Sequence, residues 1–516
     1  MKILLSTASV ARGYRLLAVI LVCGLVACND ENSAVPFPTH DDVEPAKTKH
    51  VILMIADGAS DGTWDVASYW SHGQALNKVK PYSEFPTRLA MTTYALWQRS
   101  TPVSCTQKKV QEDGYEAEKA WDTSPIYESQ PREGSGPDSP PYIRPFAGYS
   151  YLNRNYTDSA AAATAFATGQ KTYIGALGGD YCGKALTNIV SIASAENWGT
   201  GLVSSVPFNH ATPAGFTSHN ISRTNYHDIA HEILSKGELD IIIGAGHPFY
   251  TNDNEVRETP VFNYISPDDF APLARGEFVA HKRSHPWLLI EHLHDFAALA
   301  AGDVSSIEVG QPVLGLVQVS STLQARRACS MTNPVAFACP FNTDVPSLST
   351  LAKGALNVLS RHDKGFFVMI EGGAVDWAAH ANNLSGIIEE QIAFNEAVAT
   401  VVKWVEDNSN WQETLLIVTT DHGNAFVLGE DSALVPFANV RNPGIYAMPR
   451  VKFYSQNHTN ELVRLYAKGS ARAEFEQYID GVDLLYKENY NHLGTTGEFI
   501  DNTAIFKILR DIIEQR

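Results

Sequence analysis

Three apolar segments of this 516-residue sequence each lead directly into an acidic residue. The segments and the acids that follow them are His50–Ala56 with Asp57, Phe366–Ile370 with Glu371, and Leu415–Thr420 with Asp421. A single acid after a strand is usually a helix cap or a turn former, and Asp57 on its own would be interpreted that way. Ligands of parallel α/β sheets, however, bind at the carboxyl ends of the strands. Three such acids together therefore predict a carboxylate cluster that binds metal ions.

Two further pairs of residues supply ligand atoms of the kind that zinc prefers. Asp376 and His380 are four residues apart shortly after Glu371, and this spacing places both side chains on one face of a helix. Asp421 and His422 are adjacent and offer a carboxylate oxygen and an imidazole nitrogen. Each pair alone would be explained as a surface pair on a helix or as a turn. Their positions after apolar strands favour metal binding instead.

Ser159 is the candidate nucleophile. It follows Asp158 and opens an Ala-rich segment that ends at Thr168 and Gly169, a pattern that predicts a capped helix. The free N–H groups and the positive dipole end of a helix N-terminus suit an incoming phosphate. An isolated serine here would be explained as an N-cap or first-turn residue, and its hydroxyl is a weak nucleophile until a base or a metal favours the alkoxide. The metal ligands expected at the strand ends would provide that metal.

The elements that must position these residues are apolar, β-rich segments that alternate with helical patterns. They are His50–Ala56, Gly201–Val206, Ile241–Ile243, Val313–Val319, Phe366–Ile370 and Leu415–Thr420. Continuously apolar strands predict a buried, largely parallel sheet and hence an α/β fold. Residues 99–146 interrupt the alternation with Pro, Gly, Ser and charged residues, which predicts an inserted irregular region.

The N-terminus has the pattern of an export signal, because basic residues precede an apolar run from Leu16 to Ala27. This run is shorter than the roughly 20 apolar residues of a membrane-spanning helix. The small residues before Cys28 are similar to a bacterial lipobox, which predicts a lipoprotein signal peptide over 1–27. An ordinary signal peptide cut nearby is the alternative. Residues 28–48 then form a flexible tether, and we expect a periplasmic or cell-surface protein that attaches to the membrane only through a lipid on Cys28.

The charge of the chain limits its partners. The formal net charge is −18, and no basic run is present. Because clustered Lys and Arg hold the phosphate backbone of nucleic acids, we expect no nucleic-acid-binding surface.

Four cysteines follow Cys28, and in an exported protein they suggest two disulfides. Three pairings are formally open. The short loop between Cys329 and Cys339 favours that pair, which leaves Cys105 with Cys182.

The motifs occur in the order found in alkaline phosphatases, and from about His50 to the C-terminus the chain resembles that family. They are Asp57-Gly58, Thr157-Asp158-Ser159-Ala160-Ala161, His210-Ala211-Thr212-Pro213, Arg223, Glu371 with Asp376 and His380, Asp421-His422-Gly423, and His458-Thr459. The resemblance implies a three-layer α/β sandwich around a central, mostly parallel sheet. It also implies a catalytic domain over 49–516, with the insertion at about 99–146, that hydrolyses small phosphate monoesters.

The resemblance also implies cofactors, namely two Zn²⁺ and one Mg²⁺. The implied ligands are Asp376, His380 and His458 for one zinc, Asp57, Asp421 and His422 for the zinc beside Ser159, and Asp57, Thr212 and Glu371 for magnesium. Arg223 corresponds to the arginine that clamps phosphate, and Asp158 to the acid that orients it. Ser159 would form a phosphoserine intermediate between two in-line displacements.

Two C-terminal histidines are candidates for the last zinc ligand. His458 opens a polar turn that leads into an apolar strand, as in the last ligand segment of the family. His492 lies in the polar loop Asn489–Gly497 before a terminal helix over Ala504–Ile513, where a surface or capping histidine is expected. We therefore predict that His458 is the ligand.

The sequence departs from one well-known form of the family at His210 and Trp377, where other members carry Asp and Lys or two His. Both positions adjoin the magnesium and phosphate sites, so the identity and occupancy of the third metal stay open. Members are often homodimers, but the insertion could block or replace that contact, so the oligomeric state stays open as well.

Two other functional classes share part of this pattern. A phosphodiesterase, a sulfatase or another hydrolase of the superfamily would share the metal ligands, but the Asp158-Ser159-Ala160 segment and the three-metal ligand set argue against it. A non-enzymatic metal-binding surface protein would not need Ser159 beside the metals and Arg223.

Overall fold

A computed structural model describes residues 47–107, 109, 111, 114–126, 144–330 and 333–515, all of which belong to one compact unit. The predicted signal peptide, Cys28 and nearly all of the predicted tether lie outside the described residues, as does part of the predicted insertion, chiefly 127–143. Within the described ranges, no helix is long and apolar enough to cross a membrane.

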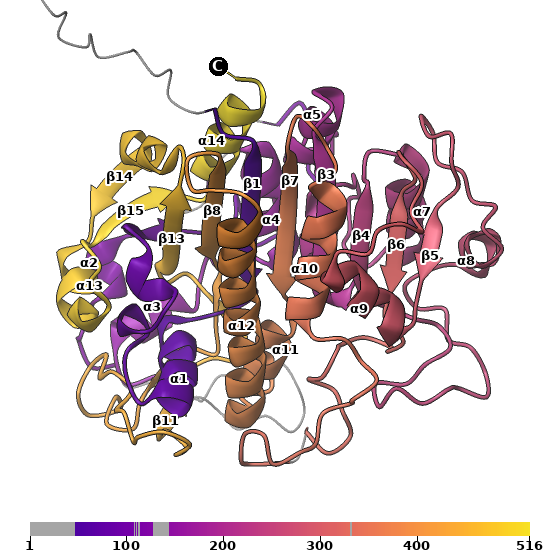
Figure 1. Cartoon of the computed structure of the whole chain (residues 1–516). Coiled ribbons are helices and arrows are strands. Elements are labelled where there is room, and N and C mark those ends of the chain that lie inside the picture. Colours follow the sequence, from indigo (N-terminus) through magenta and orange to yellow (C-terminus); the bar gives the residue numbers. More distant parts are fainter. Residues whose placement is uncertain are drawn as a thin grey trace, which may run out of the picture. The chain divides into compact units, whose positions relative to one another are not determined.

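Eleven of the described strands form one sheet in the order β14-β15-β2-β13-β8-β1-β7-β3-β4-β6-β5 (Figure 1). The strands that run parallel from β8 to β5 are β8 (Thr414–Thr419), β1 (His50–Ala56), β7 (Phe366–Gly372), β3 (Gly199–Pro207), β4 (Ile241–Ala245), β6 (Val313–Leu316) and β5 (Leu288–Ile290). The other edge consists of β13 (Val463–Gly469), β2 (Thr87–Thr92), β15 (Glu498–Asp501) and β14 (Ile479–Val482). The predicted, mostly parallel sheet is thus confirmed. The edge is mixed, because β13 is antiparallel to both of its neighbours.

The central strands are apolar throughout because helices cover both faces of the sheet. Along β1, alternate side chains enter two different cores: Val51, Leu53 and Ile55 enter one, and Ile52, Met54 and Ala56 enter the other. The first core includes side chains of α4 (Ser159–Thr168), α5 (Ile189–Ala195), α6 (Ala211–Gly215), α7 (Tyr226–Lys236), α8 (Pro267–Ala274) and α14 (Thr503–Ile513). The second includes side chains of α1 (Asp61–His72), α9 (Leu293–Ala301), α10 (Leu348–Leu359) and α12 (Leu384–Asn408). The expected three-layer sandwich is therefore confirmed, with α12 and α10 in front of the sheet in Figure 1.

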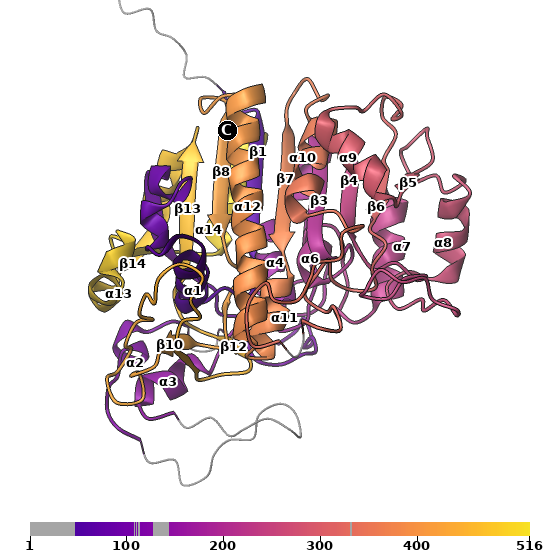
Figure 2. The ribbon, with the colours of Figure 1, turned by 60° about the horizontal axis from the view of Figure 1, so that its bottom comes forward.

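The carboxyl ends of β1, β7 and β8 meet because these strands are in register. Ile55 of β1 pairs with Glu371 of β7 on one side and with Thr419 of β8 on the other. Glu371 lies within β7, whereas the apolar pattern of the sequence predicts that this strand ends at Ile370. Helix α11 (Ala374–His380) begins directly after β7 and lies near the ends of these strands in Figure 2.

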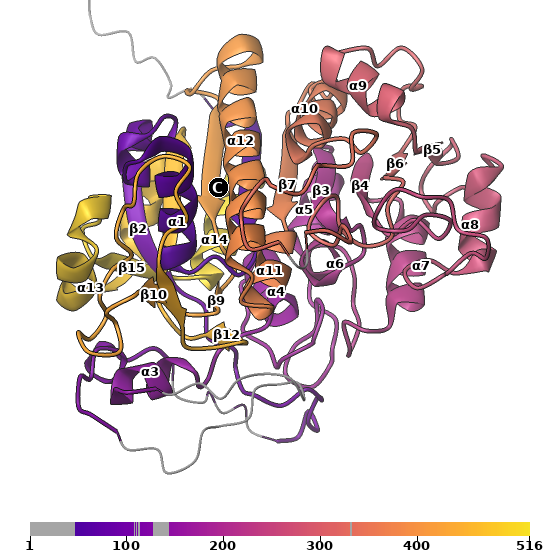
Figure 3. The ribbon, with the colours of Figure 1, turned by 90° about the horizontal axis from the view of Figure 1, so that it is seen from below.

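A two-stranded ladder brings the C-terminal part of the chain to the same edge. β9 (Gly423–Asn424) directly follows His422 and pairs with β12 (His458–Thr459), with His458 opposite Asn424. Figure 3 shows this ladder next to α11 and α4. A second ladder joins β10 (Val427–Gly429) to β11 (Val451–Phe453). The ladder of β9 and β12 therefore places His458 beside the residues that follow β8.

The described parts of the predicted insertion contain one short helix, α2 (Ala117–Ala120), and α3 (Ala147–Leu152) follows immediately after the insertion. Buried aromatic side chains connect this region to the loop after β9, since Tyr149 packs against Phe426 and Phe437. The remaining helix is α13 (Leu484–Asn489).

Both expected disulfides are present, Cys105 with Cys182 and Cys329 with Cys339. The preferred pairing of the four cysteines is thus confirmed.

Candidate metal centre

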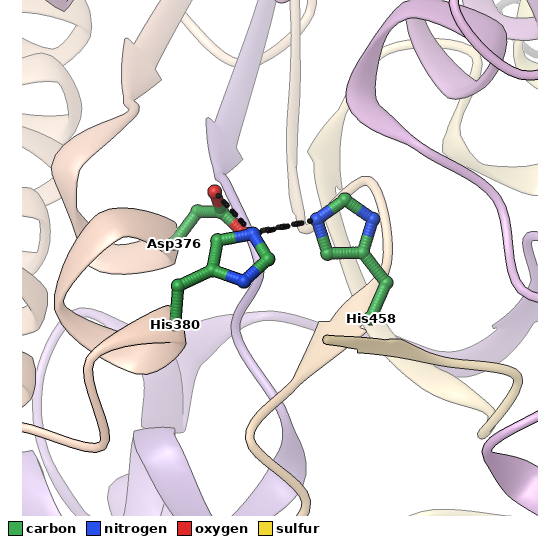
Figure 4. Close-up of side chains that lie close together, drawn as sticks. All are labelled: Asp376, His380 and His458. Atoms are coloured by element: carbon green, nitrogen blue, oxygen red, sulfur yellow. Dashed lines mark hydrogen bonds and ion pairs between the residues drawn. The ribbon is translucent and has the colours of Figure 1, made fainter. Parts of the chain in front are cut away.

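Asp376, His380 and His458 form one group of three potential metal ligands (Figure 4). The Nε2 atom of His458 lies 3.3 Å from Oδ1 of Asp376, and the Nε2 atom of His380 lies 3.4 Å from Oδ2. The two Nε2 atoms are 3.1 Å apart. Three ligand atoms therefore converge from α11 and β12, two segments that are distant in sequence.

Backbone carbonyls orient both histidines of this group. Nδ1 of His380 bonds to the carbonyl oxygen of Gln456 at 2.6 Å, and Nδ1 of His458 bonds to that of Thr157 at 2.7 Å. A carbonyl can only accept, so the proton of each neutral ring lies on Nδ1 and the lone pair on Nε2. In the neutral form of both rings, the Nε2 lone pairs are thus available to a metal ion at Asp376.

Asp57, Asp421 and His422 form the second group. Nε2 of His422 lies 3.5 Å from Oδ1 of Asp57 and 3.2 Å from Oδ2 of Asp421, and all three side chains are fully buried. Oγ of Ser159 lies 3.3 Å from the same Nε2 atom. The two groups adjoin, because the rings of His422 and His458 stack with their centroids 3.6 Å apart.

Oxygen atoms without partners gather around the second group. In the described part of the chain, both carboxylate oxygens of Asp57, Oδ2 of Asp421, Oε1 of Glu371 and Oγ1 of Thr212 are buried without a hydrogen bond. Each such atom costs about 1–3 kcal/mol unless something satisfies it. A set of buried hard oxygen donors with adjacent imidazole nitrogens fits divalent metal ions.

The raised pKa values of the buried carboxyl groups also favour bound cations at this position. Burial, followed by the charges of Asp421, Asp376 and Glu371, raises the pKa of Asp57 well above its usual value. Burial also raises the pKa of Asp421 to about 6 and that of Glu371 to about 7. Like charges in a desolvated cluster disfavour ionisation, whereas bound cations would reverse the effect.

In the first group the pKa of the carboxyl group shifts in the opposite direction, because Asp376 lies beside His380. Burial opposes ionisation of both Asp376 and His380. Their mutual attraction prevails, so the pKa of Asp376 falls well below its usual value and that of His380 rises to about 9. A metal ion at this position would replace the proton on His380.

Asp158 and Arg223, the predicted phosphate-binding residues, form an ion pair. NH1 of Arg223 donates to Oδ2 of Asp158 at 3.0 Å, and NH2 lies 3.3 Å from Nε2 of His210. Oδ1 of Asp158 accepts from the backbone N–H of Ala161 and thereby caps α4. The guanidinium is therefore fixed relative to the helix that begins with Ser159.

A pocket of about 460 Å³ opens over these groups. Seven of its lining residues were predicted from the sequence: Asp158, His210, Arg223, Asp376, Trp377, His380 and His458. The other predicted residues lie deeper and are at most 1 % exposed: Asp57, Ser159, Thr212, Glu371, Asp421 and His422. The structure thus brings every predicted site residue to one region.

Three residues of the pocket lining were missed: Tyr156, Arg326 and Asn457. Tyr156 and Asn457 directly precede predicted motifs, so proximity in sequence could have indicated them. Arg326 lies in the loop between β6 and α10, where no motif occurs.

His210 and Trp377, the two departures from the family pattern, are in contact. Their ring centroids are 5.3 Å apart, at an interplanar angle of 70°. Burial and then Arg223 lower the pKa of His210 to about 3, so the ring is neutral.

His492 lies outside this region. Its Nε2 atom is 3.1 Å from Oδ2 of Asp65, a buried carboxylate that also pairs with Arg464. The side chain is 25 % exposed, so His492 lies partly at the surface as expected, and its ring also contacts this buried acid.

Comparisons with known proteins agree with this geometry. A family model described as alkaline phosphatase matches residues 135–484. Alkaline phosphatase 4 of Bacillus subtilis is 32 % identical over 273 residues, which cover 52 % of this chain and 49 % of that protein. The alkaline phosphatase of Escherichia coli is 28 % identical over 364 residues, which cover 64 % and 72 %. The chain thus spans about half the length of the first relative.

Solved structures show the same fold. The alkaline phosphatase of the Antarctic bacterium TAB5 superposes with a TM-score of 0.56 at 22 % identity, covering 91 % of this chain and 100 % of that one. The Thermus thermophilus alkaline phosphatase also has a TM-score of 0.56, at 17 % identity, covering 91 % and 92 %.

Proposed function

The chain belongs to the alkaline phosphatase family, and from this premise we propose that it hydrolyses phosphate monoesters through a phosphoserine on Ser159. The main support is the position of its hydroxyl at the start of α4, 3.3 Å from Nε2 of His422. At this point two groups of potential metal ligands adjoin the arginine that Asp158 holds. A surface metal site without catalysis would not require this combination.

We propose two Zn²⁺ and one Mg²⁺ as cofactors. The zinc ligands would be Asp376, His380 and His458 for one ion and Asp57, Asp421 and His422 for the other. Asp57, Thr212 and Glu371 would hold magnesium, and their partnerless oxygens support this assignment. When bound, the ions would supply positive charge for the serine alkoxide, the transferred phosphoryl group and the leaving oxygen, and would lower the pKa of a bound water.

The third metal is the least constrained of the three, because His210 replaces an oxygen donor of some relatives. A variant of the TAB5 enzyme in which a histidine is replaced by aspartate has been solved with magnesium in its M3 site. Here Nδ1 of His210 is buried without a hydrogen-bond partner among the described residues. Metal analysis of the purified protein would determine which ion occupies the third site and to what extent.

The side chains of this protein have separate tasks in the proposed reaction. Arg223, held by Asp158, binds the phosphoryl oxygens with its remaining N–H groups. The first N–H groups of α4 add positive potential. Oγ of Ser159 attacks phosphorus and the alcohol leaves. A water molecule then attacks the phosphoserine, which releases inorganic phosphate and restores the hydroxyl.

Trapping the phosphoserine tests the proposal. Protein incubated with a phosphate monoester and quenched in acid should carry phosphate on Ser159, as mass spectrometry of its peptides would show. Ser159→Ala should retain its metal ions and lose turnover by on the order of 10³-fold or more. Ser360→Ala, on the exposed end of α10, is the matched control. Phosphate on another residue, or full turnover by Ser159→Ala, would reject the mechanism.

Substrate comparison distinguishes the other hydrolase classes. A phosphatase should turn over aryl phosphate monoesters far faster than the corresponding diesters or sulfate esters. A dominant diester or sulfate activity would instead assign the chain to another branch of the superfamily. Export, lipid attachment at Cys28 and homodimer formation stay predictions from the sequence.

A further inference from the structure

We propose that Arg326 forms a second anion-binding position in the pocket and selects phosphate monoesters whose alcohol carries another anionic group, a carboxylate or a phosphate. This inference rests on the proposed phosphatase function and specifies its substrate class.

Arg326 is a cation of the pocket wall without an anionic partner. Its guanidinium carbon lies 4.0 Å from the centroid of the Trp377 ring, and both residues line the pocket. Among the residues that the structure describes, its guanidinium makes no hydrogen bond or ion pair. The next residue, Arg327, differs: it is 1 % exposed and pairs with Glu389 at 2.9 Å. Of these adjacent arginines, only Arg326 is available to a ligand.

The backbone holds Arg326 in place. Its N–H donates to Oγ1 of Thr322 at 2.9 Å, and the N–H of Leu323 donates to the carbonyl of Ser205 at 3.1 Å. Ala325 packs in a small cluster that includes Trp377. A disulfide closes the following loop between Cys329 and Cys339. A charged group on such a fixed turn loses little conformational freedom when it binds an anion.

Stacking on Trp377 leaves the guanidinium suited to an anion. The guanidinium carbon lies over the face of the ring, and the guanidinium N–H groups have no hydrogen-bond partner among the described residues, so they are available for a carboxylate or phosphate. If Arg326 only covered the indole, a second anionic group on the substrate would not strengthen binding. The two roles therefore differ in their consequences for substrate choice.

A short series of contacts connects Arg326 to the phosphate side of the pocket. Trp377 contacts His210, and Nε2 of His210 lies 3.3 Å from Arg223. Arg223 is already paired with Asp158, whereas Arg326 has no such partner. The pocket therefore contains Arg223 for the reacting phosphoryl group and Arg326 for a second anionic group of the same substrate.

The pocket is large enough for both groups. Its volume of about 460 Å³ falls in the range of roughly 300–1,000 Å³ that small-molecule sites occupy. A monoester that reaches both arginines would gain charge-assisted hydrogen bonds that a neutral alcohol lacks.

Three substrates that share a chain of three carbon atoms test the inference: propyl phosphate, 2-carboxyethyl phosphate and propane-1,3-diyl bisphosphate. We expect the native holoenzyme to favour the two charged alcohols in kcat/KM, relative to propyl phosphate. In Arg326→Met, which retains an apolar contact with Trp377, this ratio should fall about 10-fold, mainly through KM. Arg275→Met, an exposed arginine remote from the pocket, should leave the ratio unchanged. A loss confined to one charged substrate would support the inference and identify the second group.

A binding measurement separates this inference from the proposed function. In a Ser159→Ala background, 3-phosphonopropanoate should bind about 10-fold more tightly than propylphosphonate by calorimetry, and Arg326→Met should abolish the difference. Absence of turnover with all three substrates would reject the phosphatase proposal itself. Turnover of propyl phosphate with a ratio that Arg326→Met does not change, or equal binding of both phosphonates, would overturn the role of Arg326.

Discussion

The carboxylate of Asp158 holds the guanidinium of Arg223 at 3.0 Å and simultaneously caps the helix that begins with Ser159. Its Oδ1 atom also accepts from the N–H of Gly175. One acid thereby fixes the position of Arg223, the proposed phosphate-binding residue, relative to Ser159, the proposed nucleophile. Charge-assisted pairs with this geometry are among the stronger hydrogen bonds of proteins.

The arginine of this pair can be tested through phosphate inhibition. Arg223→Ala should fold normally and weaken inhibition by inorganic phosphate about 10- to 100-fold, because charge-assisted hydrogen bonds worth about 1.5–3 kcal/mol are lost. Arg275→Ala is the surface control. An unchanged inhibition constant for Arg223→Ala would remove this residue from the site.

Zinc content distinguishes the two C-terminal histidines. His458→Ala should lose about one zinc ion per chain and most turnover, because only two protein ligands remain at that site. His492→Ala should retain its zinc, since its ring pairs with Asp65. Metal analysis of both proteins measures this, and loss of zinc from the His492 variant alone would reverse the assignment.

Asn424 should influence zinc affinity without binding the ion itself. Its amide donates to Oδ1 of Asp376 at 2.6 Å, and its own Oδ1 accepts from the N–H of Ala425. Asn424→Ala should weaken zinc binding about 10- to 100-fold, as loss of a ligand-orienting hydrogen bond typically does. Competition with a chelator measures the affinity, with Asn442→Ala as the exposed control. Equal affinities would show that Asp376 needs no such support.

A buried acid on α12 should make stability depend on pH. Burial and then the neighbouring Glu389 raise the pKa of Glu390 to about 7. Because this value exceeds that of an unfolded chain, Glu390 contributes stability below about pH 4.5 that is lost as the pH rises through 7. At pH 9, the free energy of unfolding of Glu390→Gln should exceed that of the native protein by up to about 3 kcal/mol, so the variant should unfold at a higher temperature. At pH 5, the two proteins should unfold at about the same temperature.

Thermal unfolding of the metal-loaded proteins between pH 5 and 9 measures this difference. Glu406→Gln, which changes an exposed acid on the same helix, should show the same dependence of unfolding temperature on pH as the native protein. Parallel curves for Glu390→Gln as well would show that Glu390 is ionised in the folded state throughout.

The positions of the strand-end acids and of Ser159 could be predicted because local patterns determine them. Asp57 and Asp421 follow continuous apolar strands, and such strands are buried and parallel. Ser159 begins an Ala-rich helix with an acidic cap. In each case, residues within ten positions along the chain contain the necessary signal.

Contacts between distant loops could not be predicted in this way. Arg326 reaches the pocket from a loop without a motif, and the pairing of His492 with Asp65 depends on packing between α1 and the C-terminal segment. Two short strands, the inner strand β2 and the edge strand β14, were also missed, because polar residues interrupt their apolar pattern. Tertiary context alone specifies these features.

The ligands of the candidate metal centre are contributed from nearly the whole length of the described chain, from Asp57 after β1 to His458 in β12. The group of Asp376, His380 and His458 is therefore incomplete in a growing polypeptide until β12 has been synthesised. Pairing over such sequence separations forms late in folding. The N-terminus predicts export, and if the chain crosses the membrane before it folds, metal capture follows translocation. The ions available in the destination compartment, rather than those of the cytoplasm, then determine which metals occupy the site.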